Sequence, residues 1–562
     1  MANCRRQDRT GSRVNKIFLK RIDAPIVVAI VALLLAAASN AKFWSTFTSA
    51  AGGLSLASLP VLAGAFLIVV LFFNACLTLT SFRFVVKPVL ILILLGAAVA
   101  SHFIASYGIV IDKAMIQNVF ETDPREAAEL FNMQFMVRVG LLGVLPSLWI
   151  ARADIRCPRG LRGLFERAGI AGGSFVLAAL LLLVFFKSLA PALHEHRELR
   201  FLLVPTNFIQ AVHGYLRHQF TPKVEVRPLG RDAVKGAAWA GQTRKTLTVI
   251  VVGETARAAN FSLNGYPRLT NPRLAQVDGL INFSHVSSCG TATAVSVPCL
   301  FSNLGRYDYS QSAAASQEGL LDVLKHAGFD VLWRDNNSGC KGVCDRVRYE
   351  DMSRPVAHDS RCDGDECHDE RLLDGLPDLI RNAGKDLVLV LHQKGSHGPA
   401  YASRYPPAFG RVGPVCAGSE FEQCSRASIQ AAYDNTILYT DFVLSTTIDR
   451  LRAISQAQDV DTAMLYFSDH GESLGENNVY LHGAPYMFAP REQTEVPMML
   501  WMSESFSERF RFDRRCLNER RSQPLSHDNL FHSVLGMLDI ETAVRNPRLD
   551  IFHPCVKENA VA

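Results

Sequence analysis

Five long apolar stretches in the first 190 residues constrain this 562-residue chain more than any other feature. A helix needs about 20 apolar residues to cross the hydrocarbon core of a bilayer, and each stretch is close to that length. The rest of the chain has the composition of an ordinary globular protein. We therefore expect five transmembrane helices followed by a soluble part. The stretches are residues 24–39, 54–79, 89–111, 135–151 and 169–189.

The connections between these stretches alternate in their content of basic residues. Seven lysines and arginines precede the first stretch and five arginines separate the fourth from the fifth, whereas one lysine separates the first from the second. Cytoplasmic loops of membrane proteins carry the excess of basic residues. The alternation predicts a cytoplasmic N-terminus in a bacterial inner membrane and a periplasmic position for the chain after about residue 190. Buried core helices, the alternative interpretation, would not produce this alternation.

Ten of the 13 cysteines lie after residue 280, on the predicted periplasmic side. An even number of cysteines in an oxidising compartment favours disulfides. A thiolate metal site is the competing interpretation, but such sites usually repeat pairs of two-spaced cysteines. The spacing suggests local pairs, which are Cys289–Cys299, Cys340–Cys344, Cys362–Cys367, Cys416–Cys424 and Cys516–Cys555.

Beyond residue 190 we expect a short connector and a long globular part. The amphipathic run 201–220 predicts a short helix at the membrane surface. After residue 243, continuous apolar runs of strand length alternate with helical patterns, as in parallel sheets buried on both faces. These patterns predict an α/β/α sandwich. The predicted strands are 247–252, 331–333, 387–391, 463–467 and 498–501, with helical patterns at 319–327 and 429–453. The predicted domains are 1–192 (transmembrane), 193–236 (periplasmic connector) and 237–562 (periplasmic catalytic domain).

Four of the predicted strands end in residues that can bind a metal or a phosphate. In open α/β sheets, ligands bind at the carboxyl ends of the strands. A carboxylate beside an imidazole is a common zinc ligand pair, but an Asp-His pair alone is more often a loop carboxylate beside a hydrogen-bonded histidine. A further carboxylate at the end of the first strand favours a metal site, for which manganese is an alternative to zinc. The strand-end residues are Glu254, then Asn337 and Lys341, then His392 and His397, then Asp469 and His470.

A nucleophile would need a hydroxyl group near that metal. Residues 289–299 are small and rich in hydroxyls, between two cysteines. A helix that begins here would favour an anion at its N-terminus, and a metal would lower the pKa of a bound hydroxyl. The same hydroxyls could simply cap a helix. The residues alone do not choose among Thr291, Thr293 and Ser296.

Four motifs can now be compared with known families. They are V-G-E-T-A-R at 252–257 with Asn260, C-G-T-A-T at 289–293 with Cys299, S-D-H-G-E-S-L-G-E at 468–476 and L-H-G-A-P at 481–485. Together they resemble the lipid A phosphoethanolamine transferases, the family that includes transferable colistin-resistance enzymes. The resemblance covers the whole chain, including the five-helix membrane domain. It implies a catalytic domain of the alkaline phosphatase/sulfatase type, with local disulfides.

The resemblance implies a role for each matching residue. Thr293 matches the nucleophile that forms a covalent phosphoethanolamine intermediate. The implied zinc ligands are Glu254, Asp469, His470 and the Thr293 oxygen. The residues that match positions holding the substrate phosphate, or a second zinc ion during turnover, are Asn337, Lys341, His397 and His482. The positions that match contacts to the phosphoethanolamine donor are Asn118, Thr122 and Glu126.

The implied activity is a double displacement. Thr293, activated by zinc, attacks phosphatidylethanolamine, and diacylglycerol leaves with His397 or His482 as the proton donor. A lipid A phosphate then takes phosphoethanolamine from Thr293, while Lys341 and zinc offset charge on the phosphoryl oxygens. The added ethanolamine cation reduces the negative charge of the outer surface, which predicts resistance to polymyxin and other cationic peptides. We expect a monomer in the inner membrane that binds these two lipids and no nucleic acid.

Two alternatives differ in the substrates or in the class of protein. A related transferase would use core heptose or another periplasmic glycan as acceptor, or a phosphoglycerol donor. A sulfatase would carry a formylglycine derived from cysteine or serine where Thr293 stands, and a hydrolase has little need of five membrane helices. A binding or sensor protein that has lost catalysis would lack some ligands, whereas here the matching set is complete.

Overall fold

The computed structural model describes residues 21–51, 53–56, 58–121, 128–195, 199–219, 225–356, 359–363 and 366–557. These residues form two compact units. The first contains the described residues up to Ser101 and those within Val137–Leu199, and the second contains those within His102–Met136 and from Arg200 onward. His102–Met136 thus belongs to the second unit, although apolar helices flank it in the sequence. The domain boundaries expected at residues 192 and 236 stay a prediction.

Apolar helices make up most of the first unit. Among the described residues, four helices are long and apolar enough to cross a membrane. They are α3 (Leu59–Leu79), α4 (Val86–Tyr107), the span Met133–Arg152, and Gly160–Phe186 of α9 (Gly160–Glu195). The span Met133–Arg152 consists of α7 (Met133–Val139), a π-helical turn (Gly140–Val144) and α8 (Leu145–Arg152). Leu183 and Val184 of α9 are 71% and 73% exposed, as expected of side chains that face lipid.

The first apolar stretch forms α1 (Ala24–Ala38), and a second helix, α2 (Ala41–Ala50), follows it in what the sequence predicted to be a connection. The two helices are bent by 60° and are long enough for a membrane span only together. This bend explains why residues 24–39 alone fall short of the about 20 residues that a crossing helix needs. Counting the pair as one span, the described residues contain the five apolar membrane helices that the sequence predicts.

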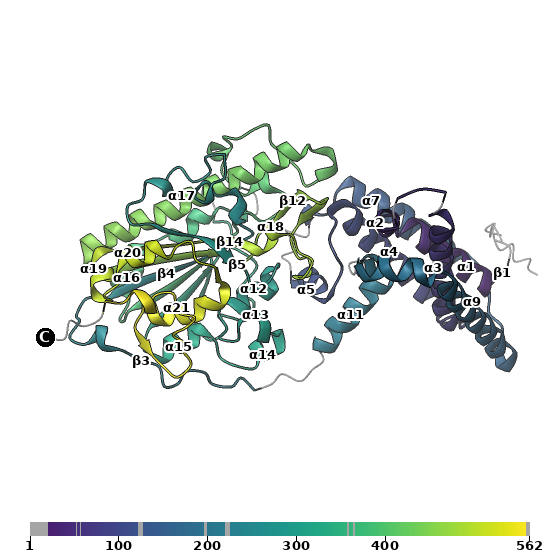
Figure 1. The fold of residues 1–562 in the computed structure, drawn as a ribbon, viewed down its shortest axis with the longest axis horizontal. Coiled ribbons are helices and arrows are strands. Elements are labelled where there is room, and N and C mark those ends of the chain that lie inside the picture. The colour runs from purple at the N-terminus through teal and green to yellow at the C-terminus, as the bar shows by residue number, and fades with distance from the viewer. Residues whose placement is uncertain are drawn as a thin grey trace, which may run out of the picture. The chain divides into compact units, whose positions relative to one another are not determined.

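An eight-stranded sheet forms the centre of the second unit (Figure 1). The central strand β4 is buried along its whole length, because its apolar side chains alternate between two covered faces. On one face, Ile250 and Val252 share a hydrophobic cluster with the helices α15 (Leu320–His326) and α21 (Leu530–Met537). The helix α17 (Arg426–Gln458) covers the other face (Figure 1). The fold is therefore the expected α/β/α sandwich. In spatial order the strands are β15 (Leu525–Ser526), β5 (Ile281–Ser287), β14 (Glu495–Met502), β11 (Asp461–Ser468), β4 (Thr246–Gly253), β10 (Leu387–His392), β6 (Asp330–Asp335) and β7 (Arg348–Asp351).

The helices that accompany this sheet in the sequence have very different lengths. The amphipathic run 201–220 forms α11 (Thr206–Gln219), and the helical patterns 319–327 and 429–453 form α15 (Leu320–His326) and α17 (Arg426–Gln458). The other helices of the unit include α5 (Lys113–Glu121), α10 (Leu199–Leu202), α12 (Thr293–Leu300), α13 (Gly305–Asp308), α14 (Gln311–Ala315), α16 (Leu376–Asn382), α18 (Arg491–Thr494), α19 (Glu504–Arg509), α20 (Arg514–Glu519) and α21 (Leu530–Met537).

The sheet differs from the predicted parallel sheet in one strand direction. β14 contains the predicted run 498–501 but runs antiparallel to both β11 and β5. An apolar run of this kind shows that both faces are covered but carries no signal of direction. β5 was not predicted, because its residues alternate between buried and partly exposed positions instead of forming a continuous apolar run.

Five disulfides join cysteines of the second unit, four of them across ten residues or fewer, with the pairing expected from the cysteine spacing. Cys289–Cys299 brackets the start of α12, and Cys416–Cys424 precedes α17. Cys76 and Cys157 are free thiols, and Cys4 lies outside the described residues. The distribution of thiols and disulfides agrees with an oxidising compartment around the second unit.

Candidate metal centre and nucleophile

Three predicted metal ligands meet at the carboxyl ends of two neighbouring strands. Glu254 follows β4, and Asp469 and His470 follow β11, which pairs with β4 in parallel. All three side chains are 0% exposed, and one ligand atom of each lies within 4.8 Å of the others. Two carboxylates and an imidazole in this arrangement can hold a divalent metal ion.

The backbone around Thr255 fixes the two carboxylates. Thr255 has a positive φ of 59°, which directs its N–H to Asp469 Oδ1 at 3.1 Å and its hydroxyl to Glu254 Oε1 at 2.5 Å. Asn337 Nδ2 donates to the other oxygen, Glu254 Oε2, at 2.7 Å. A β-carbon on Gly395 would lie 2.5 Å from the Glu254 carbonyl oxygen, so the loop after β10 can pass here only as glycine. Strained backbone of this kind is typical of functional sites.

The cluster has the donor set and the charge that a metal ion needs. Asp469 Oδ2 is buried and accepts no hydrogen bond, which is costly unless a cation binds it. His470 Nδ1 lies 3.0 Å from the Gly471 carbonyl oxygen, so Nδ1 donates the proton and Nε2 keeps its lone pair for a metal. Burial and the charge of Glu254 raise the pKa of Asp469. Burial opposes ionisation of Glu254 too, but His470, His397 and His482 lower its pKa.

The structure distinguishes the three candidate hydroxyls. Thr293, the first residue of α12, is partly exposed, and its Oγ1 lies 3.0 Å from Glu254 Oε2 and 3.2 Å from His470 Nε2. Thr291 Oγ1 instead donates to the Ala484 carbonyl at 2.6 Å, and Ser296 Oγ donates to the Asp469 carbonyl. Only Thr293 therefore presents its hydroxyl to the candidate metal ligands, at a helix N-terminus that also favours an anion.

Two histidines line the open side of this centre. The ring of His482 lies 4.5 Å from that of His470 and 5.2 Å from that of His397, between ring centroids. Glu472 Oε2 accepts from His482 Nδ1 at 2.9 Å, and Tyr401 donates to Glu472 Oε1 at 2.5 Å. Burial alone would lower the pKa of His482, but the carboxylates of Glu472, Glu254 and Asp469 outweigh it and raise the pKa to about 9.

Of the four remaining predicted residues, the structure describes Lys341 and Asn118. Lys341 Nζ donates to the carbonyl and the hydroxyl of Ser338, both at 3.0 Å, and lines a cavity of about 360 Å³ with Gln117 and Gln311. Asn118, on α5, lies beside Gly483, since its Nδ2 would be 3.9 Å from a β-carbon there. Thr122 and Glu126 lie outside the described residues.

The sequence placed His392 among the strand-end candidates but did not show which residues support the metal ligands from behind. His392 Nδ1 lies 2.9 Å from Asp335 Oδ2, so this strand-end histidine pairs with a buried carboxylate and is not in the metal cluster. Asp335 Oδ1 also accepts from the backbone N–H of Asn337 at 2.9 Å. Glu472 was visible in the motif at 468–476, but its link to Tyr401 joins residues 71 positions apart. No local sequence signal reports such a contact.

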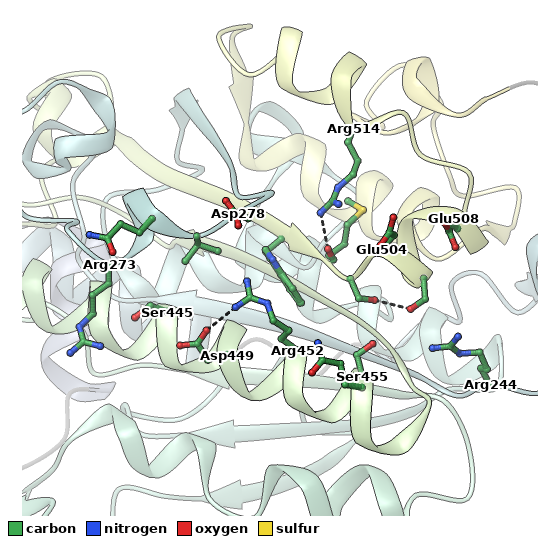
Figure 2. A pocket seen from close by; sticks show the side chains of 17 residues that line it. Arg244, Arg273, Asp278, Ser445, Asp449, Arg452, Ser455, Glu504, Glu508 and Arg514 are labelled. Carbon is green, nitrogen blue, oxygen red and sulfur yellow. Dashed lines mark hydrogen bonds and ion pairs between the residues drawn. The ribbon is translucent and has the colours of Figure 1, made fainter.

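A larger cavity lies at the opposite edge of the sheet and takes no part in this site. It has a volume of about 1030 Å³ and is lined by Arg244 before β4, by residues 273–278, by residues 445–456 of α17 and by residues 501–514 at and after the end of β14. Figure 2 shows arginines and carboxylates on its walls, and Arg452 donates a hydrogen bond to Asp449. Its four arginines face four acidic residues. This balance of charge gives no preference for an anionic substrate.

Comparisons with known proteins agree with this geometry. A family model described as sulfatase matches residues 246–540, and one described as phosphoethanolamine transferase EptA/EptB matches residues 69–220. Phosphoethanolamine transferase EptA of Escherichia coli (strain K12) is 42% identical over 485 residues, covering 86% of this chain and 88% of the relative. Phosphatidylethanolamine transferase Mcr-1 of Escherichia coli is 42% identical over 501 residues, covering 86% and 91%.

A solved structure extends the similarity to the whole chain. The integral membrane protein lipooligosaccharide phosphoethanolamine transferase A from Neisseria meningitidis superimposes with a TM-score of 0.91 at 33% identity. The match covers 96% of this chain and 100% of the other, including its membrane helices. With a sulfatase-type catalytic unit, apolar N-terminal helices and relatives above 40% identity, this chain belongs to the phosphoethanolamine transferase family.

Proposed function

We propose that this protein transfers phosphoethanolamine from phosphatidylethanolamine to a phosphate of lipid A at the periplasmic face of a bacterial inner membrane. The observation that carries the proposal is the position of Thr293 Oγ1, 3.0 Å from Glu254 Oε2 and 3.2 Å from His470 Nε2. A threonine hydroxyl is a weak nucleophile unless a base or a metal activates it. The name of the relative Mcr-1 supports the donor, and that of the Neisseria enzyme supports a lipooligosaccharide acceptor.

Zinc is the metal that the donor set favours, held by Glu254, Asp469, His470 and Thr293. Bound there, zinc would lower the pKa of the Thr293 hydroxyl and offset negative charge on the phosphoryl oxygens. The unpaired Asp469 Oδ2 and the lone pair on His470 Nε2 support this assignment. A second ion during turnover would have His397 and His482 as nearby ligands.

The protein groups suit a double displacement. In the first step the Thr293 hydroxyl loses its proton to solvent, which returns it when Thr293 is released. The bond from Thr293 Oγ1 to phosphorus forms, the bond from phosphorus to the glycerol oxygen breaks, and diacylglycerol leaves. His482 or His397 gives the leaving oxygen its proton, and Glu472 keeps the His482 ring oriented for this task. In the second step an acceptor phosphate oxygen attacks phosphorus and Thr293 is released. Lys341 supplies positive charge beside the phosphoryl group.

The proposed acceptor connects the reaction with drug resistance. Each transfer adds an ethanolamine cation to a phosphate, which lowers the negative charge that attracts polymyxin and other cationic peptides. Cells that express the protein should therefore need more polymyxin for growth inhibition than cells that express Thr293→Ala.

Release of diacylglycerol from fluorescent phosphatidylethanolamine tests the transfer chemistry. We expect release by the purified full-length protein, none above background by Thr293→Ala, and partial retention by Thr293→Ser, which keeps a hydroxyl. Intact-protein mass spectrometry should detect phosphoethanolamine on the wild type and not on Thr293→Ala. Release that is equal in Thr293→Ala and the wild type would exclude the threonine mechanism.

Mass spectrometry of the lipopolysaccharide from expressing cells identifies the acceptor. Phosphoethanolamine on the lipid A fragment supports the proposal. An unmodified lipid A beside a modified core heptose or periplasmic glycan would instead assign the protein to transferases with another acceptor.

A further inference from the structure

The segment His102–Met136 lies against the loop that carries His482. A β-carbon on Gly108 would be 2.5 Å from the Asn478 carbonyl oxygen, and one on Gly483 would be 2.9 Å from Met115 Cε. At Gly108 the neighbouring atom belongs to the backbone, so only glycine permits this close approach, whereas at Gly483 the neighbour is the end of the Met115 side chain. The segment therefore forms one wall beside the candidate active site, and Asn118 lies on that wall.

Arg404 links the same segment to the other histidine loop. Its Nη2 donates to both oxygens of Glu129, at 2.6 and 2.7 Å, and its Nε donates to the His397 carbonyl oxygen at 2.8 Å. Its Nη1 donates to Glu366. Arg404 is only 4% exposed, so these contacts form away from bulk water and are weakly screened.

We propose that Arg404 is a positioning residue that couples the segment His102–Met136 to His397 through Glu129. A planar guanidinium binds a carboxylate by two parallel hydrogen bonds, which fix direction as well as distance. The third hydrogen bond of Arg404 holds the backbone of His397 itself. Arg404 thereby holds Glu129 and the backbone of His397 in one fixed arrangement. This inference rests on the proposed transfer reaction.

The two carboxylate partners of Arg404 make a matched pair for an experiment. Glu129 belongs to the segment His102–Met136, whereas Glu366 belongs to β9 (Glu366–Cys367) and also lies 3.4 Å from Lys394 Nζ. Loss of either negative charge leaves the same guanidinium with one partner fewer. Among the described contacts, the Glu129 charge joins Arg404 to the segment and the Glu366 charge does not.

Kinetics of the purified full-length protein with phosphatidylethanolamine tests the coupling. We expect Glu129→Gln to raise KM about tenfold, with kcat changed less than about threefold, because the variant loses one partner of a buried charge pair. Glu366→Gln should change KM less than about threefold. Arg404→Gln should raise KM as Glu129→Gln does and also lower kcat about tenfold, since the His397 loop loses its support. The double variant Glu129→Gln/Arg404→Gln should have the KM of Arg404→Gln alone.

Hydrogen exchange gives a readout that needs no turnover. Amides within 102–136 should exchange faster in Glu129→Gln than in Glu366→Gln, with equal melting temperatures. If Arg404→Gln fails to fold, the comparison of Glu129→Gln with Glu366→Gln still tests the coupling. Equal KM values, or equal amide exchange, in Glu129→Gln and Glu366→Gln would overturn the coupling. A double variant whose KM increase equals the product of the two single increases would overturn it as well. A wild type that releases no diacylglycerol would overturn the proposed function, whereas the exchange comparison would still test the link.

Discussion

Thr291, Thr293 and Ser296 lie within six residues, yet their hydroxyls have different partners. Two of them donate to main-chain carbonyl groups, and the third faces Glu254 and His470. At the scale of single residues, the sequence predicted the types of group in the site, because carboxylates, histidines and hydroxyls follow apolar strands. It did not show which hydroxyl turns toward the ligands, because that depends on a contact between α12 and the loop that contains Ala484. The resemblance to a family supplied this choice.

Substitution of a single ligand should remove the metal. We expect Asp469→Asn to lower bound zinc from about one ion per chain to near zero, because the neutral amide no longer offsets the cation and Asp469 Oδ2 is lost as a ligand. Metal analysis of the purified protein by mass spectrometry measures the effect. The exposed Asp278→Asn serves as the control and should keep its metal. Full zinc content in Asp469→Asn would remove this residue from the site.

Glu472 should act on the reaction through His482 and not through the metal. The variant Glu472→Gln keeps the size of the side chain but removes the charge that holds the His482 Nδ1–H. We expect kcat to fall about 100-fold, in the range of a lost proton donor, with bound zinc unchanged. Diacylglycerol release and metal content, measured on the same preparation, separate the two roles. A parallel loss of zinc would show that Glu472 supports the metal ligands instead.

At the scale of elements, continuous apolar runs predicted β4, β6, β10, β11 and β14, and a parallel sheet brings the residues after them together. The direction of β14 and the existence of β5 depend on pairing between distant segments, which apolar runs do not encode. The helix α2 and its bend from α1 also were not predicted, because α2 contains Lys42 and several hydroxyl residues and so does not continue the apolar stretch.

The disulfide Cys289–Cys299 should matter more for activity than its loop length suggests. It brackets Thr293, so its loss frees the start of α12 as well as a ten-residue loop. We expect Cys289→Ser/Cys299→Ser to lose about 3 kcal/mol of unfolding free energy and most of its activity. Cys416→Ser/Cys424→Ser opens an eight-residue loop that does not contain a site residue, and it should lose similar stability with little change in kcat. Equal activity in the two double variants would contradict a role for the first disulfide in placing Thr293.

At the scale of the whole molecule, the chain consists of two units with different surroundings. The apolar helices of the first unit expose leucine and valine side chains, as lipid contact requires, whereas the second unit buries its apolar residues around a sheet. Length, apolarity and basic connections were enough to predict this division. The grouping of His102–Met136 with the sheet was not predictable, because the contacts of this segment join residues as far apart as Glu129 and Arg404.

Stability of the second unit should fall on mild acidification. Burial, and then the positive charge of Arg545, lower the pKa of His532 to about 4. In the unfolded chain the pKa of histidine is about 6.5. The unfolded state therefore binds the proton first, and folding free energy is lost as the pH falls from 6.5 toward 4, by at most about 3 kcal/mol. Urea unfolding between pH 7 and 4.5 should show a shallower loss for His532→Gln than for the wild type, and identical slopes would contradict the assignment.

The contact of α5 with α12 and with the loop at Gly483 has a consequence for the search for inhibitors. A shortened protein that begins at residue 237 would keep the metal ligands and Thr293 but would lack the wall that includes Asn118. Compounds selected on it would be optimised for a cleft with one side missing. Screening against the full-length protein in detergent or in lipid nanodiscs would present the complete cleft, and compounds that touch α5 would be found only there.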